Sequence, residues 1–173
     1  MSLFLSLLST LWGIGGVIGL LTLAVVRLSA QVREAWSGEF SWIHWTVLAI
    51  NSVFMAYSEG YRGFHLSFAP RVIARARVLR ESPRPLRVLL APFFCAGYFG
   101  MEWKQQRIIW GVTAGIFLLV WAVRELPQPW RGIVDAGVVV GLSLGILSIV
   151  IHGVTAMMHR QPNEAGEPTD TSP

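Results

Sequence analysis

The chain has 173 residues, of which 53% are hydrophobic and only 14% are charged. A water-soluble domain of this size needs far more polar surface, so the composition excludes an ordinary soluble protein and indicates an integral membrane protein. The formal net charge of +4 comes from arginines that lie mostly between apolar runs, which disfavours nucleic acid as a partner. The single cysteine, Cys95, excludes an intrachain disulfide and a cysteine-cluster metal site.

The apolar runs predict an all-α integral membrane fold with four transmembrane helices in one small bundle. About 20 apolar residues span the hydrocarbon core of a bilayer, and the first run, which ends before Arg27, is longer than that. It has no basic leader and exceeds the roughly 7–15 apolar residues of a signal peptide, so we expect it to be retained. We predict one transmembrane domain over residues 1–160, with spans at about 3–26, 42–57, 108–123 and 133–158.

The segments that flank the second span are a connector before it, a helix that can extend beyond it, and a short apolar run before the third span. Residues 31–41 read as a polar connector, and the second helix has no firm stop between Tyr57 and Pro70. Residues 88–101 are apolar but contain Pro92, and a helix of that length reaches only about 21 Å. We therefore predict a short re-entrant or interfacial hairpin before the third span.

Arginines concentrate between the second and the third span. Prolines interrupt this segment, and the apolar residues of 71–81 wind around a helix instead of forming one stripe, so we predict a basic cytoplasmic loop. Each arginine near a bilayer surface contributes about 1 kcal/mol of attraction to anionic lipids. The plain interpretation is a topology determinant that touches headgroups; the sharper one is a docking site for a lipid phosphate or an acidic partner. The residues are Arg71, Arg75, Arg77, Arg80, Arg84 and Arg87.

The distribution of basic residues predicts the orientation. With four spans, ten basic residues lie on one side and four on the other, so we expect both termini in the cytoplasm. Tryptophans gather near the ends of the spans, as in an aromatic belt. The preference for arginine over lysine indicates a bacterial genome, and we expect the bacterial inner membrane. Residues 161–173 are polar, acidic and proline-containing, which predicts a disordered tail.

Glycines recur at four-residue spacing in three of the spans. Such spacing places small residues on one helical face, where two helix backbones can approach closely. Ordinary packing inside the bundle is the preferred interpretation, and contact with a second copy is the alternative. The glycines are Gly15 and Gly19, Gly111 and Gly115, and Gly137, Gly141 and Gly145.

Four polar residues fall within the predicted spans, where polar groups are costly and are functional candidates: His44, Asn51, Asp135 and His152. His44 and Asp135 share a predicted depth, so we expect either an ion pair that orients two helices or a proton or cation site. Asn51 is expected to make an interhelical hydrogen bond. His152 lies about 28 Å in from the outer face and His44 lies near that face, so the two are too far apart to ligate one haem iron.

No residue pattern indicates a catalytic centre, a metal site or a cofactor. Glu59, Arg62, His65 and Glu102 form a polar cluster expected at the cytoplasmic side, with Glu59 and Arg62 near enough on a helix to pair. We expect a non-enzymatic accessory, scaffolding or assembly subunit that contacts anionic lipids and either a membrane-protein partner or a second copy. The alternatives are an oligomeric transporter or channel component that uses the polar residues within the spans, and an enzyme that acts on lipid headgroups through the polar cluster.

Overall fold

The computed structural model describes residues 2–81, 88–98 and 103–158, and within these ranges the chain is helical, with no strand. Three helices are long and apolar enough to cross a membrane: Leu8–Trp36, Gln106–Arg124 and Trp130–Ala156. The predicted all-helical membrane class is therefore confirmed. The expected second span, 42–57, is not among the three, because the α-helix there ends at Met55 and the backbone continues as a different kind of helix.

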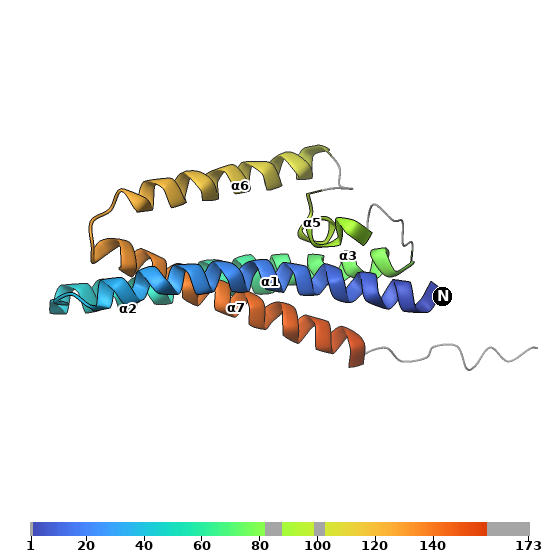
Figure 1. Cartoon of the computed structure of the whole chain (residues 1–173), viewed down its shortest axis with the longest axis horizontal. Helices are drawn as coiled ribbons and strands as arrows, with labels where there is room; N and C mark the ends of the chain where they lie inside the picture. The colour runs from blue at the N-terminus through green and yellow to red at the C-terminus, as the bar shows by residue number, and fades with distance from the viewer. Residues whose placement is uncertain (1, 82–87, 99–102, 159–173) are drawn as a thin grey trace, which may run out of the picture.

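Helix α1 (Ser2–Trp36) has 35 residues and is about 52 Å long. It contains the predicted first span and continues through half of the expected polar connector, so that only residues 37–41 lead to the next helix. Ser37 and Gly38 close its last turn by donating to the carbonyls of Glu34 and Ala35. The helix runs antiparallel to α7 and to the helix formed by residues 42–81 (Figure 1).

Residues 42–81 form one continuous helical rod made of three stretches: α2 (Trp42–Met55), η1 (Ala56–Phe68) and α3 (Ala69–Glu81). η1 is a π-helix, in which each backbone N–H bonds to the carbonyl five residues earlier. Pro70, which has no N–H to donate, follows the point where the backbone returns to an α-helix. The expectation that the helix continues beyond Tyr57 is confirmed, and it continues past Pro70 as well.

Helix α7 (Trp130–Met158) runs parallel to this rod and packs against α2 and η1. A Cβ on Gly145 would lie 2.6 Å from the ring of Phe64, and a Cβ on Gly141 would lie 3.1 Å from the Cβ of Glu59. A side chain at 145 would overlap the Phe64 ring, and one at 141 would require its neighbour to shift by a few tenths of an ångström. Gly137 lies on the same face, so this glycine face is where α7 meets the rod.

The other predicted glycine pairs lie in open space. A Cβ at any of these four glycines, on α1 or on α6, would meet no described atom within 4 Å: Gly15, Gly19, Gly111 and Gly115. α1 is approached closely at Gly13 and Gly16 instead, where Cys95 and Pro92 lie over its backbone.

Helix α5 (Ala91–Ala96) supplies those two residues and packs against α1 and α3. Gly97 ends it with a φ of 102°, a left-handed conformation that glycine adopts without strain. Six residues are too few to cross a bilayer. Residues 99–101 of the predicted hairpin lie outside the described part of the chain, and its insertion into the membrane stays a prediction.

Helix α3 corrects the prediction for the arginine segment. Residues 69–81 are helical, and their buried side chains form one stripe: Ala69, Val72, Ile73, Ala76 and Leu79. Spacings of three and four residues are those of a helix face that packs on a core. One stripe was not expected from the sequence, because Val78 and Ala74, which are exposed, break it when all apolar residues are weighed equally; the cytoplasmic position of the segment stays a prediction. Most of the stripe packs with α5, Val17 and Ile149 in the main core cluster.

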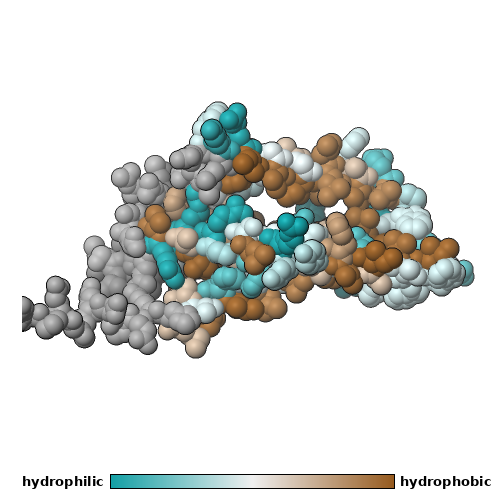
Figure 2. Space-filling model, turned by 180° about the vertical axis from the view of Figure 1, so that it is seen from behind, coloured by the Kyte–Doolittle hydropathy of each residue, from teal (hydrophilic) through white to brown (hydrophobic). Residues whose placement is uncertain are grey.

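Helix α6 (Trp103–Arg124) stands apart from the other helices (Figure 1). None of its described side chains is buried, and the large apolar residues from Ile116 to Trp121 are exposed around its whole circumference. Tyr98 holds its first half, with the hydroxyl 2.9 Å from Thr113 Oγ1 and the ring 5.5 Å from that of Trp110. Figure 2 shows an opening between this largely hydrophobic helix and the rest of the molecule, with hydrophilic residues beside it.

Candidate functional site

The polar residues of η1 lie level with the middle of α7. A Cβ on Gly60 would be 2.8 Å from the Leu144 side chain, next to the contact between Phe64 and Gly145. Leu144 is midway along α7, so a bilayer crossed by α7 would enclose η1. π-Helical turns are rare and occur frequently at functional sites. We therefore take the polar side chains of η1 as the candidate site: Ser58, Glu59, Arg62, His65 and Ser67.

This placement differs from the predicted position of the cytoplasmic polar cluster. Glu59, Arg62 and His65 lie beside the middle of α7, whereas the prediction set them beyond the inner end of the second span. Glu102, the fourth member, lies outside the described residues. The shift arises because the second helix continues for 13 π-helical residues past Met55.

Glu59 and Arg62 do not form the expected ion pair. Among the side chains that the structure describes, the one ion pair joins Arg131 and Asp135, both on α7. A π-helix has wider turns than an α-helix, so residues three apart point further away from each other around the axis. The Cβ of Glu59 lies against Gly141 of α7 and its Oε2 lies near Gly63, whereas Arg62 points to a different side of the rod.

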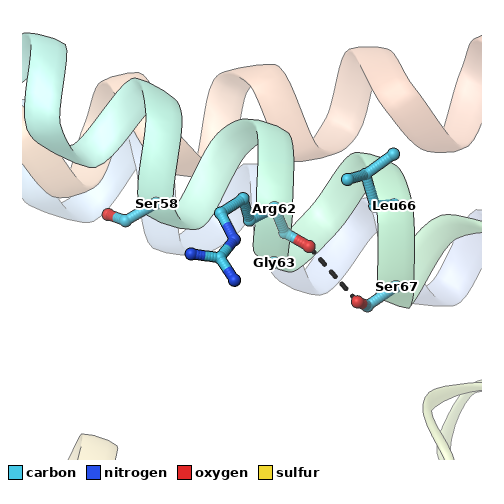
Figure 3. A pocket seen from close by; sticks show the side chains of 5 residues that line it. All are labelled: Ser58, Arg62, Gly63, Leu66 and Ser67. Carbon is cyan, nitrogen blue, oxygen red and sulfur yellow. Dashed lines mark hydrogen bonds between the residues drawn. The ribbon is translucent and has the colours of Figure 1, made fainter.

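Arg62 belongs to an open pocket of about 470 Å³ that is lined by one face of η1 (Figure 3). The Arg62 side chain is exposed and extends to the side of η1 away from the ribbon of α7 (Figure 3). Ser58 Oγ donates to the Phe54 carbonyl at 2.8 Å, and Ser67 Oγ donates to the Arg62 carbonyl at 3.2 Å. Gly63 and Leu66 complete the lining, so the pocket has a positive charge and no acidic residue in its wall.

A column of rings occupies another face of η1. Tyr57 stacks on Tyr61 with ring centroids 6.1 Å apart, and Tyr61 stacks on His65 at 5.7 Å. Residues four apart are neighbours on the surface of a helix, so these rings can stack along the rod. His65 then meets His152 of α7 edge-to-face at a centroid distance of 4.8 Å.

The two histidines are too few to form a metal site. His152 Nδ1 donates to the Ser148 carbonyl at 2.9 Å, since a carbonyl can only accept. Two imidazoles supply half of a tetrahedral ligand set. Among the described residues, no group of three or more His, Cys, Asp or Glu could hold a metal ion. Sequence reasoning missed the pairing of His65 with His152 because the two residues come from different helices.

His44 and Asp135 are not paired with each other. His44 caps α2, with Nδ1 accepting from the Ser41 N–H at 3.1 Å, and its ring lies 5.0 Å from that of Trp130. Asp135 is buried, and its ion-pair partner is Arg131, with Nε and Oδ2 3.9 Å apart. The proposed proton or cation site therefore lacks the contact on which it depended.

Asn51 makes the interhelical hydrogen bond that its depth predicts. Its Nδ2 donates to the carbonyl of Ile133 on α7 at 2.8 Å. The amide lies directly over Gly137, where a Cβ would overlap it. Gly137 therefore makes room for a polar contact between α2 and α7.

The arginine segment divides into inward and outward residues. Arg71 and Arg77 are exposed on α3, and Arg80 belongs to the same helix. Arg75 points inward, where Nη1 donates to the Phe94 carbonyl at 2.6 Å and the guanidinium lies 5.0 Å from the Phe94 ring centroid. It thereby joins α3 to α5. Arg84 and Arg87 lie outside the described residues.

No family model, curated protein or solved structure matches this chain. The candidate site is defined by geometry alone: a polar π-helix beside the middle of α7, with Arg62 facing away from the bundle toward open space.

Proposed function

We propose that this protein is a non-enzymatic subunit of a larger membrane assembly, with a partner that packs between α6 and η1. The isolation of α6 carries the proposal, because no described side chain of this spanning helix is buried. Lipid gives helices no hydrophobic drive to associate, so they associate through close packing and polar contacts. A helix that packs on so little of its own chain leaves that surface to another protein.

The polar face of η1 supports the same conclusion. Acyl chains are a poor environment for Arg62, Ser58 and Ser67, since charged and polar groups at membrane depth face protein or water. Figure 2 shows hydrophilic residues beside the opening under α6. A partner segment in this opening would cover both the apolar helix and the polar face.

The proposal includes a four-span topology in the bacterial inner membrane, with α2 and η1 together as the second span. The start of α1 and the end of α7 lie at the same end of the molecule (Figure 1). Both termini would then be cytoplasmic, with Arg71 and Arg77 near anionic headgroups. Alkaline phosphatase is active only outside the cytoplasm, so fusions after Gly38 and after Glu125 should be active and a C-terminal fusion inactive. The reverse pattern would refute the orientation.

The assembly is tested by extraction in a mild detergent followed by native mass spectrometry. We expect a stoichiometric protein partner with the wild-type chain. Replacing Gly111 and Gly115 by leucine adds bulk on α6 where this chain has no described atom within 4 Å, and should release the partner. The same replacements at Gly15 and Gly19 on α1 are the matched control. A lone monomer would refute the assembly, and a partner retained by the α6 variant would refute the role of that helix face.

A further inference from the structure

Arg62 has no counter-ion on the described part of this chain. Its side chain is exposed, and no described carboxylate lies within ion-pair distance. Both hydroxyls in its pocket donate their protons to backbone carbonyls, and the remaining lining is glycine and leucine. Glu59 Oε2 lies near Gly63, 3.4 Å from where a Cβ on that glycine would stand, but it is not within ion-pair distance of Arg62, so the pocket presents one positive charge without a paired carboxylate.

The depth of Arg62 makes this charge unusual. Gly60 and Phe64, on either side of it in the chain, pack on Leu144 and Gly145 at the middle of α7. An arginine near the end of a spanning helix reaches the headgroups by extending its side chain, but the centre of the core is about 15 Å from either surface. A charge at this depth pairs with a group that lies at the same depth.

We infer that Arg62 binds a carboxylate on a transmembrane helix of the partner protein, so that the pair fixes the register of that helix between η1 and α6. The inference rests on the proposed function and names the chemistry of the partner. A guanidinium binds a carboxylate through two parallel N–H donors, which adds geometric specificity to the attraction. Gly63 adds no side chain to the pocket wall, and Leu66 offers an approaching helix an apolar contact beside the charge.

Depth also decides between a protein carboxylate and a lipid phosphate. Phosphates lie outside the hydrocarbon core, whereas Arg62 is level with the middle of α7. A carboxylate carried by a spanning helix can lie at any depth that its sequence position dictates. Charge complementarity and depth together favour an Asp or Glu of the partner.

The test measures the ratio of partner to full-length chain by native mass spectrometry, after extraction from the native membrane. Arg62→Gln should lower this ratio at least about tenfold, because it leaves the partner's carboxylate buried without its counter-ion. Arg62→Lys should lose less, since it keeps the charge but not the two-donor fork. Arg77→Gln, which removes an equally exposed arginine from α3, is the matched control and should change nothing.

A second measurement identifies the group that meets Arg62. Leu66 in the pocket wall is replaced by the photo-crosslinking residue p-benzoylphenylalanine, and the crosslinked peptide is sequenced. We expect the crosslinked peptide to come from a transmembrane segment of the partner and to contain an Asp or Glu. The Arg62→Glu variant should lose the wild-type partner and should bind a partner in which that Asp or Glu is replaced by Lys. This charge exchange remains decisive even when Arg62→Gln alone does not fold.

The outcomes separate this inference from the proposed function. A partner that is retained by Arg62→Gln but released by the α6 leucine variant would overturn the inference and leave the assembly standing. A crosslink to lipid only, to a second copy, or to a peptide without a carboxylate would overturn it as well. Absence of any stoichiometric partner would overturn both.

Discussion

Replacement of Gly145 by alanine tests the close contact between α7 and η1. The new Cβ would lie 2.6, 2.7 and 2.9 Å from three carbons of the Phe64 ring, where ordinary contacts begin at 3.4 Å. The ring cannot retreat freely, because it packs edge-to-face on Phe68 at 5.4 Å. Overpacking of this kind costs about 1–3 kcal/mol, so we expect the free energy of unfolding to fall by that amount.

The matched control is Gly115→Ala on α6, where a Cβ meets no described atom within 4 Å. Alanine is favoured over glycine in a helix by up to about 1 kcal/mol, so the control should be neutral or stabilising. Thermal unfolding in one detergent, followed by circular dichroism, should show a midpoint roughly 2–12 °C lower for Gly145→Ala. Phe64→Leu should recover part of the loss in the double variant. Equal midpoints for the two alanine variants would refute the packing argument.

Asn51→Ala should lower the free energy of unfolding by about 0.6–1.7 kcal/mol in the same assay, because it removes the hydrogen bond to Ile133; an unchanged value would contradict this. Arg131→Met leaves the buried Asp135 without its partner and should cost about 3–5 kcal/mol, whereas Arg131→Met with Asp135→Leu should be close to wild type. Equal losses in the single and the double variant would argue against the pair. Burial raises the pKa of the Cys95 thiol to about 11, above about 8.5 in an unfolded chain, so the folded state keeps a proton that the unfolded state loses. The stability of wild type relative to Cys95→Ala should therefore be constant below about pH 8 and fall as the pH rises to about 11. Parallel melting curves over that range would refute this assignment.

The membrane class could be predicted because it depends on length and apolar composition, which a sequence states directly. The apolar runs of α1, α6 and α7 can be identified without knowing which residues they contact. Asn51 could be predicted for a similar reason, since an amide at membrane depth has few ways to satisfy its hydrogen bonds other than a neighbouring helix.

Contacts that depend on the angle between helices could not be predicted. The four-residue spacing correctly identified the glycine face of α7. Gly15 and Gly111 have the same spacing, but a Cβ on either would meet no described atom within 4 Å. The glycines of α1 that lie under α5 are Gly13 and Gly16. His44 and Asp135 share a depth, yet they point to Trp130 and Arg131. Depth limits which residues can meet, and the rotation of each helix about its axis decides which do.

The directions in which the candidate site residues point depend on the change from α-helix to π-helix at Ala56. Nothing in the local sequence marks this change, and with α-helical geometry Glu59 and Arg62, three residues apart, would be near enough to pair. With the π-helix in place, Glu59 turns toward α7 and Arg62 turns away from it, at the depth of Leu144. One backbone feature thus sets where the polar side chains of η1 point, and the proposed partner carboxylate follows from the exposed position of Arg62.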